Sequence, residues 1–489
     1  MIKKFIYFIV GCLFLLLGVM IWNMKEFTSR QIDVTTINIV SIDNDKSIKH
    51  LAEAIAYRTI SNNKSKDIDA MTFLSFHKFL RRTYPLTFNQ LSERIFSNYS
   101  MLLKWEGNSK STKNPILLMA HMDVVPSGEI EKWEEDPFEG IVKDNFIWGR
   151  GTLDDKSSLI AILESLEHLI ALNFKPSRDI YISIGHDEEN SGVNGNAIIA
   201  ETLRNEGVYF DMVLDEGSVI SNGIVKGATK PIAIIGIAEK GYLTMELISS
   251  FNSGHSSMPG NSTTIGKLSK AINRLERFQM TPKITPALKH FFNYIGPELS
   301  LKDKFILSNS TLLSSSIINE LIKEPVTAAM LRTTMAPTMI SSGFKSNILP
   351  SEAIATINFR ILQGDSIEKV KQHVIKTIND NNIEVRLSSD DLYSNPSNVS
   401  NIDSPSFNII HKTIKEIHNN ILVAPGLVIA TTDSRYFEDI SKDIYRFMPI
   451  SLTLEDLSMI HGFNEKISIS GYLNMIQFYI QLIKNFHVS

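Results

Sequence analysis

The chain has 489 residues, of which 43% are hydrophobic and 21% are charged, and its formal net charge is −4. This length exceeds the usual upper size of one domain, so we expect two domains, and the composition is ordinary for a globular protein. No long basic run occurs in the sequence, which argues against nucleic acid as a partner.

The single cysteine, Cys12, lies in an apolar segment near the N-terminus. Disulfides and cysteine-based zinc sites are therefore excluded for the rest of the chain. Any metal ion would have to be held by His, Asp and Glu side chains.

The uncharged segment 5–22 follows two lysines and has the composition of a membrane-spanning helix. The lysines favour a cytoplasmic N-terminus, which would place the catalytic part on the extracytoplasmic side. A cleaved signal peptide is the second interpretation, and the protein would then be secreted. A lipoprotein signal ending at Cys12 is the third. We expect residues 23–45 to form a polar linker.

Strand-like and helix-like segments alternate through residues 46–231, and one amphipathic helix is predicted over residues 159–170. The short apolar runs typical of buried strands are Pro115–Ala120, Asp179–Gly185 and Asp211–Leu214. This alternation predicts an α/β domain with a mostly parallel sheet and helices on both faces. The same pattern resumes in residues 391–489 and ends in an amphipathic helix, so these residues would complete the domain.

Residues 232–390 show a different pattern, with strands and helices in the order β-α-β-β-α-β. We expect a smaller α+β domain here, inserted into the α/β domain. Residues 280–335 are additional to that pattern, and the sequence does not place them.

Acidic and imidazole side chains follow each of the three predicted buried strands. His121 and Asp123 follow the first strand, Glu188 and Glu189 the second, and Asp215 the third. Ligands of open α/β sheets gather beyond the carboxyl ends of strands, so we expect these side chains to lie close together.

Two more residues belong to this set. Asp154 follows the turn Gly149–Gly151, just before the predicted amphipathic helix, and His461 lies in the loop before the last helix. Each piece alone is more often a solvated surface feature. Together, however, they place many carboxylates at the ends of apolar runs, where divalent cations would offset their charge.

These side chains can form binding sites for two metal ions. A carboxylate that bridges two ions, with two further ligands for each, leaves an open position for water. We expect His121 and Asp215 to bind one ion, Glu189 and His461 to bind the other, and Asp154 to bridge them. Nitrogen and carboxylate ligands suit Zn²⁺, with Co²⁺ or Mn²⁺ as substitutes.

Two residues of the set would support the chemistry without binding metal. Asp123 is placed to orient His121. Glu188, next to the ligand Glu189, is the natural general base. It would take a proton from a water whose pKa the ions lower toward about 7, and later pass it to the leaving amine.

Taken in order, a series of motifs resembles the co-catalytic zinc metallopeptidases, a family that includes carboxypeptidase G, succinyl-diaminopimelate desuccinylase and aminoacylase-1. The motifs are HMDVVPSGEIEKWEEDPFEG, WGRGTLDDK, GHDEE, LDEG, GHSSMPG, SNILP, NFR, TTDSR and HGFNEK. The chain is most similar to the carboxypeptidase S branch and its animal N-acyl-amino-acid hydrolase relatives. The resemblance begins near Ile60 and continues to the C-terminus.

This resemblance implies a zinc-exopeptidase catalytic domain with a ferredoxin-like lid inserted in it. It implies two Zn²⁺ per chain on the five ligands named above, with Glu188 as the proton acceptor and Asp123 in support. It also implies a cis peptide bond between Asp154 and Asp155.

The resemblance also assigns substrate contacts. His255 matches a histidine that contacts the scissile carbonyl oxygen and comes from the opposite subunit in dimeric relatives; a capping or surface histidine is the alternative. Asn347 and Arg360 match lid residues that hold the substrate carboxylate. Arg435 is a further candidate, since a guanidinium binds a carboxylate with paired donors. The alternative for Arg435 is a structural ion pair with Asp433.

These residues predict a zinc metallohydrolase that cleaves an amide or peptide bond next to a free carboxylate, as a carboxypeptidase or an N-acyl-amino-acid amidohydrolase. The substrate would be a small peptide or an N-acyl amino acid, and the lid is the candidate surface for a homodimer. The alternative is an inactive membrane-anchored binding protein of the same fold, which the presence of Glu188 and all the ligands argues against. A two-zinc aminopeptidase fits the inserted lid less well.

Overall fold

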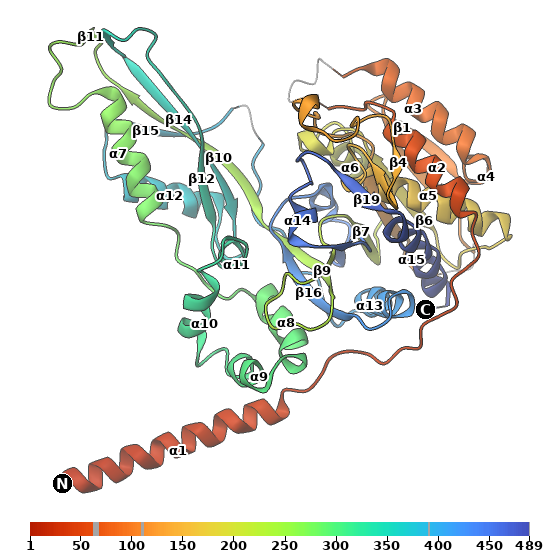
Figure 1. Ribbon diagram of the computed structural model, residues 1–489, viewed down its shortest axis with the longest axis horizontal. Helices are drawn as coiled ribbons and strands as arrows, with labels where there is room; N and C mark the ends of the chain where they lie inside the picture. The colour runs from red at the N-terminus through yellow and green to blue at the C-terminus, as the bar shows by residue number, and fades with distance from the viewer. Residues whose placement is uncertain (62–67, 109–111, 390–391, 489) are drawn as a thin grey trace.

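The computed structural model describes residues 1–61, 68–108, 112–389 and 392–488. Two bodies stand side by side, each built on its own sheet, and an N-terminal helix extends away from them (Figure 1). The predicted end of the inserted domain, at residue 390, lies outside the described residues.

The larger body contains a ten-stranded sheet in the order β1-β2-β6-β3-β7-β17-β9-β8-β18, with β16 paired to β9. Its strands are β1 (Ser92–Phe96), β2 (Ser100–Trp105), β3 (Ile116–His121), β6 (Ile180–Gly185), β7 (Met212–Asp215), β8 (Ile220–Ser221), β9 (Ile232–Glu239), β16 (Leu422–Val428), β17 (Ile444–Arg446) and β18 (Ser451–Leu452). A small separate sheet joins β4 (Val142–Lys143), β5 (Phe146–Trp148) and β19 (Lys466–Ser468).

The large sheet is mixed, whereas the sequence predicts a mostly parallel one. The neighbours β6, β3, β7 and β17 are parallel, but β1, β2 and β6 form an antiparallel edge, and β9 runs antiparallel to β8 and β17. The edge is antiparallel because a short turn, with positive φ at Ser97 and Asn98, reverses the chain directly between β1 and β2.

Both faces of this sheet are covered by helices. Successive residues of β3 point to opposite sides of the sheet, and each set lies in a different core. Ile116 and Leu118 belong to the large core under α2, α3, α5, α13 and α15, while Leu117 belongs to a smaller core under α6. The predicted helices on both faces are therefore present. The helices of this body are α2 (Asn44–Ile55), α3 (Ala70–Thr83), α4 (Pro85–Gln90), α5 (Lys156–Ala171), α6 (Asn196–Asn205), α13 (Pro405–Ile417), α14 (Leu454–Leu457) and α15 (Ile469–Val488).

The smaller body contains a four-stranded antiparallel sheet in the order β12-β14-β10-β15. Its elements are β10 (Gly241–Ser250), α7 (Thr264–Arg277), β12 (Thr334–Ser342), β14 (Glu352–Ile361), α12 (Ile367–Ile378) and β15 (Ile383–Leu387). They follow the β-α-β-β-α-β order expected from the sequence. The sheet begins at Gly241 and not at Ile232, because the intervening strand β9 belongs to the large sheet.

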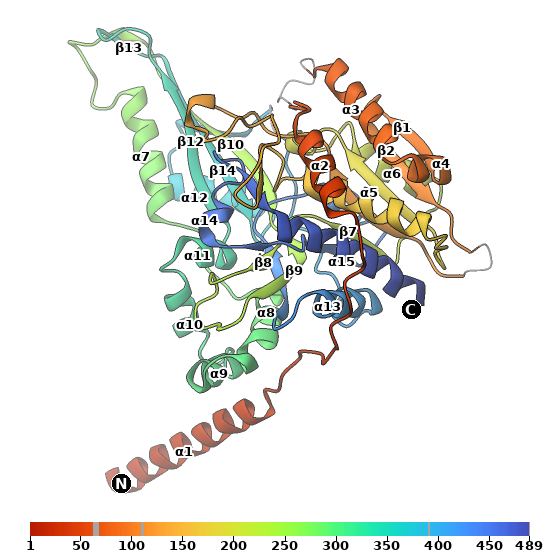
Figure 2. The ribbon, with the colours of Figure 1, turned by 45° about the vertical axis from the view of Figure 1, so that its right-hand side comes forward.

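A core of its own joins this sheet to α7 and α12, and it includes Leu247, Leu268, Ile357 and Val374. At the end far from the larger body, β11 (Gly254–His255) pairs with β13 (Ile348–Leu349) and forms the tip seen in Figure 2.

The additional segment between α7 and β12 forms four short helices. They are α8 (Pro286–Ile295), α9 (Leu301–Ser308), α10 (Ser314–Leu321) and α11 (Pro325–Leu331). Helix α8 packs on β16 and contributes Tyr294 and Ile295 to the large core. Helix α9 lies against the end of α1 (Ile2–Glu26) (Figure 1).

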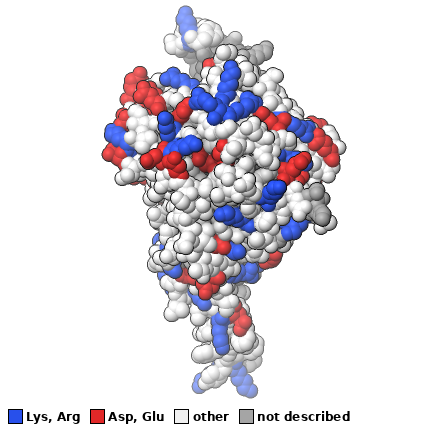
Figure 3. Space-filling view, turned by 90° about the vertical axis from the view of Figure 1, so that its right-hand side faces the viewer, with Lys and Arg blue, Asp and Glu red and all other residues white. Residues whose placement is uncertain are grey.

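Helix α1 is long and apolar enough to cross a membrane, and it points away from both bodies (Figures 1 and 2). Its last turns are held by Asn309, whose side-chain amide donates to the Met20 carbonyl (3.1 Å) and accepts from Asn23 Nδ2 (3.0 Å). The segment between α7 and β12, whose position could not be predicted from the sequence, therefore connects the apolar helix α1 to the larger body. On the face of the molecule shown in Figure 3, basic and acidic side chains are interspersed.

Candidate metal centre

Three neighbouring parallel strands end beside one another and deliver the candidate residues. His121 is the last residue of β3 and lies opposite Gly185, the last residue of β6. The segment after β6 carries Glu188 and Glu189, and β7 ends at Asp215. The sequence reasoning about the carboxyl ends of these strands therefore predicts the location of the site.

Asp154 stands between the two histidines. Its Oδ1 lies 2.9 Å from His121 Nε2, and its Oδ2 lies 3.0 Å from His461 Nε2. Each carboxylate oxygen thus faces a different imidazole, which is the arrangement expected of a bridging ligand. The peptide bond between Asp154 and Asp155 is cis, as the motif resemblance implies.

Two groups of ligand atoms share Asp154. One consists of His121, Asp154 and Glu216, and the other consists of Asp154, Glu189 and His461. His121 Nε2 lies 3.5 Å from Glu216 Oε1, and His461 Nε2 lies 3.2 Å from Glu189 Oε2. The first imidazole is buried, whereas the side chain of His461 is 53% exposed, so the second group opens toward solvent.

Glu216, and not Asp215, joins His121 in the first group. The Oδ2 atom of Asp215 instead accepts a hydrogen bond from the backbone N–H of Ser434 (3.0 Å). Strand alternation does not predict this difference. Val213 packs in the core on the α6 face, so alternation places Asp215 on that face, and Leu117 and Met119 place His121 there too. Glu216 follows the last residue of β7 and joins His121 from beyond the end of the strand. The LDEG motif offers both carboxylates, and the strand pattern does not identify Glu216 as the partner of His121.

The donor set fits divalent cations. Burial and the neighbouring Asp154 raise the pKa of Glu189 to about 7 and that of Glu216 to about 8. Glu189 Oε1 is buried and has no hydrogen-bond partner within the described part of the chain. Such crowding of carboxylates is costly unless a cation offsets their charge. Imidazole nitrogens with carboxylate oxygens are the ligands that zinc accepts.

Asp123 supports the site without joining either ligand group. It is fully buried, and its backbone carbonyl lies 2.9 Å from His121 Nδ1. Its carboxylate accepts the backbone N–H groups of Glu188 (3.2 Å) and Glu189 (3.1 Å). Burial opposes its ionisation, but the hydrogen bond and charge of His121 and the hydrogen bond from Ser61 together outweigh burial and hold the pKa of Asp123 below its usual value. Asp123 therefore positions a candidate ligand and the candidate base together.

Glu188 lies beside the cluster. Burial raises the pKa of Glu188 well above its ordinary value, and the nearby carboxylates of Asp433, Glu216 and Glu189 act in the same direction. His186, two residues before Glu188, is buried behind the site, with Nδ1 2.6 Å from Ser100 Oγ.

The sequence pattern of peptidase family M20/M25/M40 matches residues 117–485 of the chain. The chain belongs to this family. Probable carboxypeptidase S-like 2 of Dictyostelium discoideum is 39% identical to it over 484 residues, which cover 96% of this chain and 92% of that protein. The N-fatty-acyl-amino acid synthase/hydrolase PM20D1 of Xenopus tropicalis is 38% identical over 450 residues, which cover 90% of this chain and 86% of that protein.

Solved structures show the same fold. The M20 family metallo-carboxypeptidase Sso-CP2 of Sulfolobus solfataricus has a TM-score of 0.66 at 20% sequence identity, and the match covers 92% of this chain and 100% of that one. The protein is thus a hydrolase of the metal-dependent M20 family, and the motif resemblance is confirmed.

The four candidate substrate residues of this M20 chain fall into two places. Arg360 lies near the cluster: it pairs with Tyr242 across β14 and β10, and its guanidinium stacks on the Tyr242 ring at 4.6 Å. Burial and the nearby Arg435 lower the pKa of Arg360, while Glu188 acts in the opposite direction. Arg435 donates hydrogen bonds to the carbonyls of Thr432 (3.1 Å) and Ser191 (2.9 Å).

His255 and Asn347 lie together at the tip of the smaller body, where the Ser256 N–H donates to the Asn347 carbonyl (3.2 Å). Both side chains are exposed, and Figures 1 and 2 show the tip far from the strand ends of the large sheet. Within one chain, the structure does not bring them to the candidate metal ligands around Asp154.

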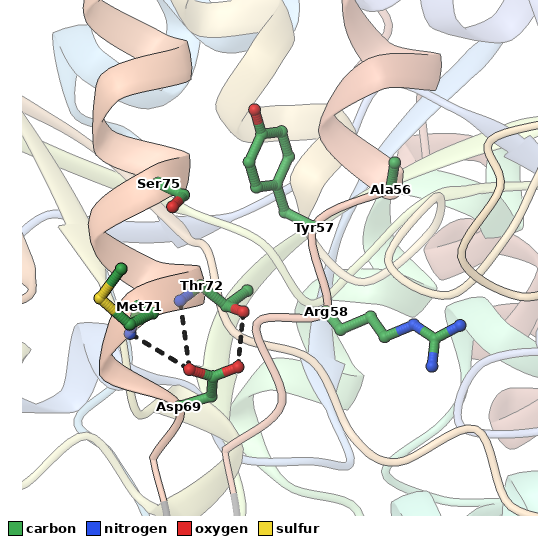
Figure 4. Close-up of a pocket in the computed structure, with 7 residues that line it drawn as sticks. All are labelled: Ala56, Tyr57, Arg58, Asp69, Met71, Thr72 and Ser75. Carbon is green, nitrogen blue, oxygen red and sulfur yellow. Dashed lines mark hydrogen bonds between the residues drawn. The ribbon is translucent and has the colours of Figure 1, made fainter.

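A separate pocket lies between the end of α2 and the start of α3 (Figure 4). Its carboxylate, Asp69, caps α3 by accepting from Met71 N (3.1 Å) and Thr72 Oγ1 (2.7 Å). None of the residues lining this pocket belongs to the metal cluster, and its acidic group is used in helix capping.

The roles of the two carboxylates of the LDEG motif can be separated by substitution. Glu216→Gln should weaken metal binding, because it removes the negative charge of a candidate ligand beside His121. Asp215→Asn should retain the wild-type metal content, because the amide oxygen can still accept the Ser434 N–H. Metal content after dialysis, measured by inductively coupled plasma mass spectrometry, distinguishes them. Loss of metal in Asp215→Asn but not in Glu216→Gln would instead support Asp215 as the ligand that accompanies His121, as expected from the sequence.

Proposed function

We propose that this M20 protein is a two-zinc amidohydrolase that cleaves an amide bond next to a free carboxylate. Two ligand groups that share Asp154, with Glu188 beside them, support this proposal most directly. His121 and Glu216 would hold one ion, Glu189 and His461 the other. Co²⁺ or Mn²⁺ could replace zinc at such ligands.

The bound ions would polarise the scissile carbonyl and lower the pKa of water toward about 7. Glu188 would accept the proton of that water and return it to the leaving amine. The raised pKa of its buried carboxyl suits both halves of this transfer, since a base that is too acidic would not hold the proton. Asp123 would keep Glu188 in place through the backbone N–H that it accepts.

Arg360 would bind the substrate carboxylate. Its guanidinium lies over the Tyr242 ring and close enough to Glu188 for the two charges to interact. A planar guanidinium binds a carboxylate through two parallel hydrogen bonds. Arg435 is already bonded to two backbone carbonyls, so we propose that it adds positive charge without contacting substrate directly.

N-acyl amino acids and N-blocked dipeptides are the proposed substrates. Relatives carry the names carboxypeptidase S-like and N-fatty-acyl-amino acid synthase/hydrolase, and both activities act at an amide beside a carboxylate. The word synthase in the second name also implies formation of the amide bond, and the same residues would support this reverse reaction.

The smaller body is proposed to act as a lid and as the surface of a homodimer. His255 and Asn347 at its tip would then reach the metal site of a second copy, since they do not reach their own. Strand β12 is an edge strand, with Met339 66% and Ile340 62% exposed, and Phe344 beside it is 85% exposed. Apolar side chains on an open strand edge favour pairing with another chain.

Helix α1 is proposed to anchor the protein in a membrane, with the catalytic part on the extracytoplasmic side. Cleavage after the helix would release a secreted form. Alkaline carbonate extraction of membranes carrying the full chain would retain an anchored protein and release a peripheral one.

Removal of the proposed base tests the chemistry. Glu188→Gln should lower kcat by about 10²- to 10⁴-fold on N-acyl amino acids, the usual contribution of a general base, with little change in metal content. Release of free amino acid, followed by mass spectrometry in the wild-type and variant proteins, measures this. Equal rates for the two proteins would contradict the role of Glu188.

Arg360 can be tested with paired substrates. Arg360→Met should lower kcat/KM by about 10²- to 10³-fold for an N-acyl amino acid, as expected for loss of a buried charge pair. The corresponding amino-acid amide, which has no carboxylate, should be turned over slowly and equally by both proteins. An equal loss on both substrates would show that Arg360 does not recognise the carboxylate.

The dimer is tested by sedimentation velocity of the full chain in detergent. Ile340→Asp should shift a dimer to a monomer, because it places a charge on the exposed strand edge. The monomer should also lose activity if the tip residues serve the partner site. A fully active monomer would contradict the proposed exchange of His255 and Asn347.

A further inference from the structure

The two ligands that do not follow the buried strands of the large sheet, Asp154 and His461, are connected by one buried ion pair. Glu465, in the segment that leads into β19, is fully buried, and Arg150, in the turn before α5, is 2% exposed. Arg150 Nη1 donates to Glu465 Oε2 at 2.6 Å. Neither residue belongs to either ligand group.

Glu465 holds the backbone of the turn that carries Asp154. Its Oε1 accepts the N–H groups of Gly151 (3.0 Å), Leu153 (2.7 Å) and Asp154 (3.3 Å). Its own backbone carbonyl accepts the Gly149 N–H at 2.9 Å. Gly149 and Gly151 have φ of 140° and 92°, so this turn uses backbone conformations that leave its N–H groups without helix or strand partners.

Arg150 connects the same carboxylate to the loop of His461. Its Nη2 donates to the carbonyl of Gly462 at 2.7 Å. His461 has φ of 59°, in the left-handed region that non-glycine residues rarely occupy and that surrounding structure must enforce. Because the His461 side chain is half exposed, packing alone does not fix it, and the bond from the buried Arg150 holds the carbonyl of the next residue, Gly462.

We infer that Glu465 and Arg150 are positioning residues, which set the separation between the bridging carboxylate of Asp154 and the imidazole of His461 and thereby the second metal position. The inference rests on the proposed two-metal function. A buried ion pair contributes little to stability by itself. Four donors converge on the Glu465 carboxylate, however, and its two oxygens can accept from all of them, whereas a side-chain amide has only one oxygen to accept.

The test is metal affinity, measured by competition with a chelator on the full chain in detergent, together with kcat and KM. Glu465→Gln turns one acceptor into a donor that faces Arg150, while the remaining oxygen can still serve the backbone N–H groups. It should lower the affinity for one of the two ions by about 10- to 100-fold, the usual effect of removing a partner that orients a ligand. The affinity for the other ion should be nearly unchanged. The value of kcat should fall more than KM rises.

Two further variants separate positioning from stability. Arg150→Lys keeps the charge but cannot hold both Glu465 and Gly462 in the same geometry, so it should lower the affinity for the same ion. This variant replaces Glu465→Gln in the test if Glu465→Gln does not fold. Glu164→Gln is the matched control: its carboxylate accepts from Ser47 (2.9 Å) and Tyr84 (2.9 Å) and belongs to neither ligand group, so it should lower the melting temperature without changing metal affinity.

Native affinity for both ions in Glu465→Gln and Arg150→Lys, with only a lowered melting temperature, would overturn the inference and leave the proposed function intact. A wild-type protein that binds fewer than two ions would overturn the proposed function, and this inference with it.

Discussion

The repulsion among buried carboxylates at one end of the large sheet is the constraint on which the rest of the site depends. Asp154, Glu188, Glu189 and Glu216 lie together there, with pKa values of about 7 for Glu189 and about 8 for Glu216 that show how strongly burial and their neighbours disfavour ionisation. Two imidazoles alone do not offset so many negative charges. Divalent cations would, and each carboxylate charge that repels its neighbours would then strengthen the binding of an ion.

The fold supplies these side chains with unequal rigidity. His121 ends a central strand that is buried on both faces, and Asp123 fixes it from behind. Asp154 and His461 sit in irregular segments, far apart in the sequence, where no strand sets their positions. A site that needs both kinds of ligand therefore requires a separate connection between the loops. The buried Arg150–Glu465 pair, which bonds to both segments, provides one.

Much of this arrangement could be predicted from the sequence, because buried parallel strands are continuous apolar runs and the residues after them must meet at one edge. β3, β6 and β7 lie within a residue or two of their predicted positions, and Asp154 stands between the two histidines as expected. The choice between Asp215 and Glu216 could not be made from the sequence, because alternation along β3 and β7 puts His121 and Asp215 on the same face, whereas Glu216 joins His121 from beyond the end of β7. The helices after α7 could not be placed because their apolar residues are shared between a small local core and the large one.

Long-range contacts account for the remaining differences. The strand β9 looks like the start of the smaller body in sequence, but its partners β16 and β17 come from the C-terminal third of the chain, which places it in the large sheet. His255 and Asn347 match substrate-binding motifs, yet the structure of one chain does not bring them to its own cluster. The motifs identify such residues, and the proposed dimer would decide which copy of the chain they serve.

The central claim is that Asp154 bridges two metal ions. Anomalous diffraction at the zinc absorption edge, from crystals of the zinc-loaded protein, tests it directly. The account predicts two peaks about 3.5–4 Å apart, the usual spacing of paired catalytic metals, with one oxygen of Asp154 directed to each. A single peak, or two peaks of which only one contacts Asp154, would contradict it.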